Sequence, residues 1–361
     1  MTLAHMTPRE RVERVLRGGR ADRVPFTMYE NKLPQCRAER DLRNRGLCIV
    51  DRRVKVVTAL RPNVKSTETR STQDGRPLVR TTHETPVGAV SMVREPAGFT
   101  SWFRERLFKG PEDYKVLRFL IDDEVFAPCY RPFVDARRAW GGDAILRPQL
   151  AGEPLQVLIS NWMGTEAFCY EWMDRRDEVL DLYHALVAHH RKVYPLVAAS
   201  PALHANYGGN VVPEIVGLEG FETYYVPNYN EAAEHMHAHG KLVGSHLDAN
   251  CGVLKHAIAR TALDYIEAFT PAPDTDLTLA EARAAWPDKV LWLNFPSSVH
   301  LRPDEEVERF TFDLLEELDT VDGLLMGITE DIPPDRWQGS CRAIMDGLDR
   351  HAAERPELYA R

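Results

Sequence analysis

Short apolar runs recur along the chain and are separated, in its second half, by stretches with helical spacing. The runs predict eight strands, at residues 25–29, 145–149, 155–160, 202–206, 242–246, 263–268, 290–294 and 323–327. The helical patterns between most of them cover residues 177–198, 229–239, 254–260, 279–285 and 304–318. Strands that alternate with helices are typical of parallel sheets with right-handed crossovers, and eight of them close a (β/α)8 barrel.

Two further patterns complete the predicted architecture. Thr7, Pro8 and Glu10 are spaced as in a capping box, which predicts a helix from there to about Gly18. Residues 75–94 alternate in character and contain turn residues, which predicts a β-hairpin within an irregular insertion at about 50–105. We therefore expect one α/β domain over residues 1–361, a TIM barrel with an N-terminal helical extension and a β-hairpin insertion.

Composition narrows the class of protein. The net charge is −9 and there is no long basic block, which argues against a nucleic-acid partner. No apolar run reaches the roughly 18 residues that a membrane span needs, and the N-terminus is too short and polar for a signal peptide. The six cysteines form no CxxC pair, which is typical of reduced thiols. These features predict a cytoplasmic protein that acts on a small molecule, with neither nucleic acid nor membrane as partner.

Polar side chains gather where the predicted strands end. His246 and Asp248 lie two residues apart at the end of a strand, so their side chains point the same way, and Glu330 follows the last strand. In barrels the carboxyl ends of strands carry the chemistry. A His/Asp/Glu set with an open position suits a catalytic Zn²⁺, and other divalent ions accept the same ligands. Cys251, three residues past Asp248, is an alternative ligand, and a structural histidine–carboxylate pair is the alternative without a metal.

Further polar and aromatic residues have predicted roles in the same site. Tyr29 and Glu30 end the first strand, where a glutamate could supply a proton to a leaving group, although packing of the tyrosine and solvation of the glutamate are the alternative. The neutral amides of Asn206, Asn210 and Asn294, at or just after strand ends, are expected to orient substrate oxygens. Trp162 is expected to line the substrate pocket or to pack in the core.

Three stretches carry a family resemblance: residues 7–11 together with 23–26, residues 221–229 together with 240–246, and residues 327–334. They resemble the uroporphyrinogen decarboxylase superfamily, and most of all its corrinoid-linked methyltransferases. The resemblance extends over nearly the whole chain. It implies a TIM barrel, a zinc site, methyl transfer involving a corrinoid, and a homodimer.

Two departures from that superfamily refine the expected chemistry. The decarboxylases carry paired arginines after the first strand, whereas here no arginine occurs there before Arg37. The methyltransferases use an HxC motif and a later Cys, whereas this chain has His246-Leu-Asp248 and, at the later position, Glu330. Oxygen ligands leave a metal harder and better suited to polarise an ether oxygen than thiolates do.

The resulting hypothesis is demethylation of a methoxylated, aromatic substrate. The chain has no Asp-x-His-x-x-Gly signature for a corrinoid, so a separate corrinoid protein would receive the methyl group. The alternative is a uroporphyrinogen-decarboxylase-like lyase that acts on a small carboxylate. A third reading is a non-catalytic relative that binds a small ligand.

Overall fold

A computed structural model describes residues 6–98 and 100–360 of the chain. The described residues fall into two compact units. The first consists of residues up to 56, residues 130–150 and residues from 198 onward, and the second consists of residues 57–129 and 151–197. Within the described parts of the chain, no helix is both long and apolar enough to cross a membrane.

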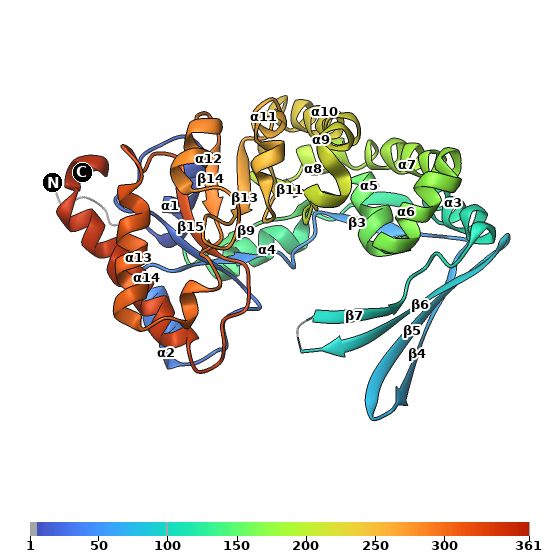
Figure 1. The fold of residues 1–361 in the computed structure, drawn as a ribbon, viewed down its shortest axis with the longest axis horizontal. Coiled ribbons are helices and arrows are strands. Elements are labelled where there is room, and N and C mark those ends of the chain that lie inside the picture. The colour runs from blue at the N-terminus through green and yellow to red at the C-terminus, as the bar shows by residue number, and fades with distance from the viewer. Residues whose placement is uncertain (1–5, 99, 361) are drawn as a thin grey trace. The chain divides into compact units, whose positions relative to one another are not determined.

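The first unit is built on one sheet of nine strands (Figure 1). Along the chain these are β1 (Phe26–Tyr29), β2 (Cys48–Asp51), β9 (Ala144–Leu146), β10 (Gln149–Ala151), β11 (His204–Tyr207), β12 (Leu242–His246), β13 (Tyr265–Phe269), β14 (Val290–Leu293) and β15 (Leu324–Ile328). Their order across the sheet is β10-β11-β12-β13-β14-β15-β1-β2-β9. The strands from β11 through β15 and on to β1, β2 and β9 pair in parallel.

The two ends of this sheet lie close together. β9 and β10 stand at opposite ends of the strand order, yet only Arg147 and Pro148 separate them in sequence. Nine flat strands would span roughly 38 Å, whereas this link reaches about 10 Å. The sheet must therefore curl round, and the amide of Asn206 in β11 donates to the carbonyl of Pro148 at this junction (3.0 Å). The architecture is that of an α/β, TIM-like barrel.

Helices connect these strands. They are α1 (Pro8–Leu16), α2 (Arg37–Arg45), α4 (Arg131–Trp140), α9 (Pro213–Tyr224), α10 (Val226–His237), α11 (Lys255–Ala259), α12 (Leu279–Ala285), α13 (Asp304–Glu316) and α14 (Trp337–Glu354). Every residue of β1, β13, β14 and β15 is buried, as expected for parallel strands covered on both faces. The capping box of α1 is confirmed, since Thr7 accepts from the Glu10 amide and the Glu10 side chain accepts from Thr7.

Two predictions about elements were wrong. Residues 155–160 are helical, in α5 (Pro154–Gln156) and η2 (Val157–Met163), because a short apolar run does not distinguish a strand from a buried helix. Strand β2 was not predicted, and it lies at the border of the stretch that was expected to be irregular. Its four residues are all buried, but four residues are too few to show the hydrophobic periodicity of a strand.

The second unit contains two antiparallel sheets. β3 (Val57–Leu60) pairs with β8 (Val125–Pro128). A four-stranded sheet consists of β4 (Lys65–Gln73), β5 (Arg76–Thr85), β6 (Gly88–Ala97) and β7 (Thr100–Glu105), so the predicted hairpin is half of a larger sheet. Asp74 and Gly75 both have positive φ in the tight β4–β5 turn, a conformation that glycine adopts without strain. The principal helices of this unit are α3 (Tyr114–Asp122), α6 (Thr165–Asp174) and α7 (Arg176–His190), and α8 (Tyr194–Ala198) leads back to the first unit.

Candidate active site at the strand ends

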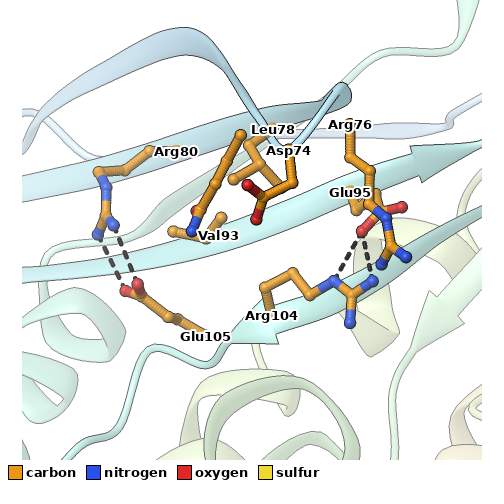
Figure 2. A pocket seen from close by; sticks show the side chains of 9 residues that line it. Asp74, Arg76, Leu78, Arg80, Val93, Glu95, Arg104 and Glu105 are labelled. Atoms are coloured by element: carbon orange, nitrogen blue, oxygen red, sulfur yellow. Dashed lines mark hydrogen bonds and ion pairs between the residues drawn. The ribbon is translucent and has the colours of Figure 1, made fainter.

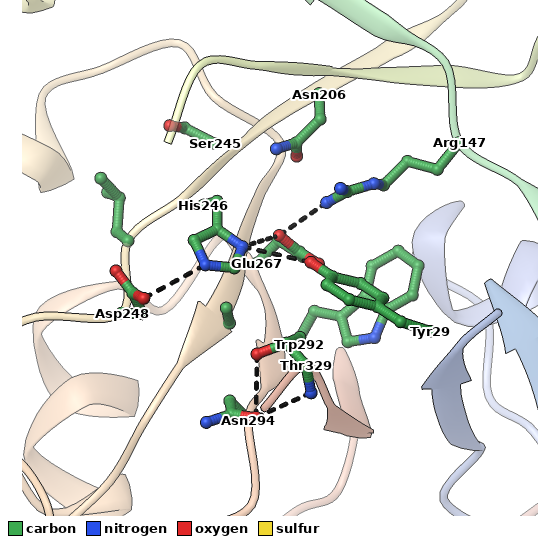
Figure 3. Close-up of polar contacts among 12 residues, drawn as sticks. Tyr29, Arg147, Asn206, Ser245, His246, Asp248, Glu267, Trp292, Asn294 and Thr329 are labelled. Atoms are coloured by element: carbon green, nitrogen blue, oxygen red, sulfur yellow. Dashed lines mark hydrogen bonds and ion pairs between the residues drawn. The ribbon is translucent and has the colours of Figure 1, made fainter. Parts of the chain in front are cut away.

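A polar cluster occupies the carboxyl ends of strands in the first unit (Figure 3). His246 is the last residue of β12, and its register partner in β13 is Glu267. Tyr29 ends β1, and Arg147 follows β9. Glu267 is fully buried, and Arg147 and Tyr29 are nearly so. Four strands therefore place ionisable groups at one point inside the sheet.

His246 is held between two carboxylates. Its Nδ1 lies 2.6 Å from Glu267 Oε2, and its Nε2 lies 3.2 Å from Asp248 Oδ2. The hydroxyl of Tyr29 lies 3.2 Å from the same Nδ1 and donates to Glu267 Oε1. On the other side of Glu267, Arg147 Nη1 is 2.6 Å from Oε2. Glu267 is thus the centre of the cluster.

The charges of the cluster balance. Burial alone would lower the pKa of His246, but Glu267 and Asp248 raise it to about 10. Burial alone would raise the pKa of Glu267, but Arg147 and His246 hold it well below the usual range of a glutamate. Two cations, Arg147 and His246, therefore flank Glu267, which stays ionised because both are in contact with it.

Tyr29 is a protonated phenol in this cluster. Burial raises the pKa of Tyr29 well above its ordinary value, with Arg147 opposing the rise and Glu267 adding to it. Two guanidinium groups face its ring, since the Cζ of Arg52 lies 3.5 Å and that of Arg147 lies 5.2 Å from the ring centroid. The hydroxyl can therefore donate a hydrogen bond at neutral pH, while the ring is held by cation–π contacts.

The loop after β11 is shaped around His246. The backbone amide of Asn210 donates to the carbonyl of His246, and Asn210 has φ of 57°. Gly209 has φ of 146°, and a Cβ on it would lie 2.7 Å from the Cβ of His246. The Gly-Gly-Asn sequence at 208–210 thus permits a close approach to the histidine. Asn210 contributes its backbone to the site.

The two remaining predicted amides differ in their surroundings. Asn294 Oδ1 accepts from the amide and the hydroxyl of Thr329, both at 2.9 Å, and its Nδ2 donates to Thr270. Asn294 therefore fixes the chain that leaves β15. Asn206 is buried and donates to Gly208, but its Oδ1 has no hydrogen-bond partner among the described residues. Of the two, only Asn206 has an amide oxygen, Oδ1, that could accept a hydrogen bond from a ligand.

Several predicted site residues are not part of the His246 cluster. Glu330 is exposed after β15. Glu30 Oε2 accepts from Nε of Arg52 at 3.2 Å. Trp162 belongs to η2 in the second unit, where its carbonyl accepts from the Phe108 amide. Cys251 is buried, and burial raises the pKa of its thiol to about 12, so it is protonated at neutral pH.

The residues present fit a metal ion only in part. Within the described ranges, no three His, Cys, Asp or Glu side chains form a group that could hold one. Asp248 and Glu267 contact opposite nitrogens of the His246 ring, so both cannot share an ion with it. A metal ion would have to displace a proton from His246, whose Nε2 would then be a donor beside Asp248, and Glu267 on Nδ1 has the place of the outer carboxylate that orients a metal-bound histidine. The expected third donor, Glu330, does not join them.

Two important residues were not predicted. Arg147 interrupts the apolar run 145–149, and a lone arginine inside a buried strand is a signal that a carboxylate partner must exist. Arg52, just after β2, was missed together with that strand. Glu267 was visible only as a carboxylate within an apolar run.

Comparisons with known proteins identify a structural relative. No known family profile matches the chain, and no curated protein matches it in sequence. Among solved structures, a methyltransferase from Methanosarcina mazei has a similar fold, with a TM-score of 0.56 and 11% sequence identity. The match covers 96% of this chain and 99% of that one. At this identity the similarity is one of fold, and it extends over both proteins nearly in full.

Proposed function

We propose that this protein is a metal-dependent methyltransferase of the uroporphyrinogen decarboxylase superfamily. It demethylates a methoxylated, aromatic substrate and passes the methyl group to a separate corrinoid protein. The observation that carries the proposal is the Asp248–His246–Glu267 arrangement at the strand ends. The fold shared with a methyltransferase supports it.

The reaction breaks the bond between the methyl carbon and the ether oxygen. Both electrons of that bond would stay on the oxygen as a phenolate, and a reduced, Co(I) corrinoid on the partner protein would supply the electron pair that accepts the methyl group. A divalent cation, Zn²⁺ by preference, would be held by His246 and Asp248, with Glu330 proposed as the third ligand, and would supply Lewis-acid polarisation of the ether.

The chain's own residues bind and orient in this scheme. Tyr29 carries a proton and donates a hydrogen bond, and its raised pKa makes it a donor to developing oxygen charge rather than a proton source. Glu30 is held by Arg52 and is assigned to proton handling next to Tyr29. Asn206 offers a buried acceptor to the substrate, whereas Asn294 and Asn210 fix the loops around it. Trp162 is assigned to the substrate pocket.

The test measures methyl transfer and metal content together. Purified protein is incubated with cob(I)alamin and a panel of methoxybenzoates and methoxyphenols, and methylcobalamin is followed by absorbance and the phenol by chromatography. His246→Ala and Asp248→Asn should lose the bound metal and lower the transfer rate by roughly a hundredfold or more. Glu330→Gln should weaken metal retention, whereas its exposed neighbour in Asp331→Asn should not. Metal-replete protein that transfers no methyl group from any ether would contradict the proposal.

A lyase acting on a small carboxylate is the second candidate, and the two arginines next to Tyr29 favour it. A decarboxylase needs cationic groups to hold the acid, and Arg52 and Arg147 lie at the ends of β2 and β9. Both are opposed by carboxylates, Glu30 and Glu267, so neither adds a net positive charge. Release of CO2 from the same benzoates without cobalamin would support the lyase and count against methyl transfer.

The proposal extends to the architecture. We propose a (β/α)8 barrel in which β9 and β10 are one strand interrupted at Arg147 and Pro148. Residues 1–361 are then a single domain, in which the two segments of the second unit interrupt the barrel sequence. The protein acts in the cytoplasm, with a small-molecule methyl donor and a corrinoid protein as its partners.

A further inference from the structure

One face of β11 carries two buried acceptors that are not satisfied. His204 and Asn206 lie two residues apart on this strand, so their side chains project from the same side of the sheet. His204 is fully buried, and Asn206 is 1% exposed. In the part of the chain that the structure describes, neither His204 Nε2 nor Asn206 Oδ1 has a hydrogen-bond partner. A buried acceptor without a donor is costly, so both atoms are suited to receive hydrogens from a ligand.

The contacts of His204 fix which ring nitrogen carries its hydrogen. Nδ1 lies 3.0 Å from the hydroxyl oxygen of Tyr265. That hydroxyl donates its one hydrogen to the carbonyl of Ala205 at 2.9 Å, so it accepts from the imidazole and Nδ1 is the protonated nitrogen. Burial and the charge of Arg147 lower the pKa of His204 to about 3, so the ring is neutral. Its Nε2 is therefore an acceptor without a hydrogen.

The orientation of the Asn206 amide is fixed in a similar way. Its Nδ2 donates to the carbonyl of Gly208 at 3.4 Å, so the atom turned away from that carbonyl is the oxygen. In Figure 3 the amide points from β11 toward the space between His246 and the guanidinium of Arg147. Strand pairing agrees with this view, because Asn206 lies opposite Gly244, two residues before His246. The oxygen thus faces the cluster around His246.

Arg147 adds a donor to these two acceptors. Its Nη1 is 2.6 Å from Glu267 Oε2, whereas its Nε has no hydrogen-bond partner within the described ranges. Because Arg147 is positive and Glu267 is negative, a charged ligand group of either sign would meet a like charge here. Two acceptors and one donor in neutral surroundings favour an uncharged ligand group that donates more than one hydrogen.

A hollow on the four-stranded sheet of the second unit provides a contrast. Its volume is about 440 Å³, and charged side chains line it. Arg80 pairs with Glu105 and Arg104 pairs with Glu95 (Figure 2). These four charges satisfy one another, so they need no ligand group. The unsatisfied atoms on β11 are the stronger indication of a binding site.

We propose that His204 and Asn206 bind two hydroxyl groups of the substrate, so that the substrate is a methoxylated catechol. One hydroxyl donates to His204 Nε2 and the other to Asn206 Oδ1, and a hydroxyl oxygen accepts from Arg147 Nε. A carboxylate would bring no hydrogen to either acceptor and would lie near Glu267. The inference rests on the proposed function, because it assumes that the bound ring is the one whose ether is cleaved.

The first test compares ligands that lose one hydroxyl at a time. Binding of 3-methoxycatechol, 2-methoxyphenol and methoxybenzene to the full-length protein is measured anaerobically by isothermal titration calorimetry. No corrinoid is present, so no methyl group is transferred. Each hydroxyl removed should weaken binding at least about tenfold, because one buried acceptor then stays unpaired. 3-Methoxybenzoate should bind no better than methoxybenzene.

The second test connects the hydroxyls to the two side chains, since chelation of a catechol by a metal would also give a graded series. Asn206→Leu and His204→Phe each remove one acceptor. In each variant the ratio of the affinities for 3-methoxycatechol and methoxybenzene should fall at least about tenfold, a change that chelation would not produce. His300→Phe is the matched control, because His300 is also a buried imidazole but contacts Ser340, and it should leave the ratio unchanged.

The outcomes separate this inference from the proposed function. Equal binding of the three ligands, or a graded series that Asn206→Leu leaves unchanged, would overturn the inference, because a fixed water or a metal would then account for the binding. Methyl transfer together with equal binding would contradict the inference alone. A graded series that depends on Asn206, without methyl transfer, would support the hydroxyl site and contradict the proposed function. Circular dichroism checks that each variant is folded, and Asn206→Leu decides the test if His204→Phe is not.

Discussion

At the scale of single residues, Glu267 has the most demanding role. It is fully buried and contacts Arg147, His246 and Tyr29. Removing its charge would leave Arg147 and His246 in the interior with fewer compensating carboxylates. A buried charge without its partner costs far more than an exposed one, since solvent cannot replace the lost contact.

We therefore expect Glu267→Gln to lower the free energy of unfolding by about 3–5 kcal/mol. Urea denaturation followed by circular dichroism measures this. Glu330→Gln, at an exposed glutamate, is the control and should change stability by less than about 0.5 kcal/mol. Equal stability of the two variants would show that the buried ion cluster contributes nothing.

Asn206 tests whether the unpaired amide oxygen serves a ligand. Asn206→Ala removes the acceptor. If the oxygen binds substrate, Asn206→Ala should raise KM by roughly tenfold in the methyl-transfer assay with a smaller change in kcat. The matched variant Asn294→Ala should instead lower stability, because Asn294 binds Thr329. A KM unchanged by Asn206→Ala would contradict the role.

Contacts within the site can be predicted from the sequence when the two residues are close along the chain. His246 and Asp248 are two apart on a strand, so alternation alone brings them together, and the structure confirms their contact. The pairing of Arg147 with Glu267 joins residues 120 positions apart, by the numbering, and depends on strand order and depth. Glu330 was predicted from its position just after the last strand and from the family resemblance, and in the structure it is exposed.

At the scale of elements, local signals decide how well boundaries are predicted. α12 begins at a capping box in which Thr278 accepts from the Glu281 amide at 3.1 Å and the Glu281 carboxylate accepts from the Thr278 amide at 2.9 Å. Its bounds and those of β12 were predicted to the residue. In contrast, the apolar run at 155–160 carries no cap or turn residue that distinguishes a strand from a buried helix.

Thr278→Ala should lower the free energy of unfolding by about 1 kcal/mol, because the first turn of α12 loses its cap. Thr278→Ser is the control, since serine retains the hydroxyl and should keep most of the stability. Thermal melts of the two variants and the wild type provide the measurement. A serine variant that is as unstable as the alanine variant would mean that the methyl group, and not the cap, matters at this position.

At the scale of the whole molecule, three histidines with lowered pKa make the stability of both units depend on pH. Burial lowers the pKa of His204 to about 3 and those of His190 and His300 to about 4. Each is neutral in the folded state, whereas in the unfolded chain each binds a proton below about pH 6.5. Their contribution to the free energy of unfolding is therefore fully present above pH 6.5. It is lost as the pH falls toward 4, because the unfolded chain binds protons that the folded protein does not.

We expect the free energy of unfolding to fall by about 2 kcal/mol per histidine between pH 7 and pH 5. Urea titrations at several pH values measure the slope. His300→Asn, which removes a titrating ring that contacts Ser340, should make the fall between pH 7 and pH 5 smaller by about 2 kcal/mol. A stability that is flat between pH 7 and pH 5 would contradict neutral burial of these rings.

The same scale shows what patterning alone could establish. Parallel α/β character and the positions of most strands of the large sheet followed from periodicity, because buried parallel strands read as apolar runs. The break between β9 and β10 was not predicted from periodicity. Arg147 and Pro148 lie inside one short run, and nothing in that run indicates that its two halves belong to opposite ends of the sheet. A second unit with its own sheets was foreseen only as a hairpin, because exposed strands such as β4 carry no apolar pattern.

The interrupted strand has one further consequence. β9 and β10 stand at opposite ends of the strand order and are joined by the dipeptide that contains Arg147, so the residue at the junction of the sheet also supplies the guanidinium that neutralises Glu267. A substitution at Arg147 should therefore disturb the junction between the two sheet ends and the buried carboxylate at the same time.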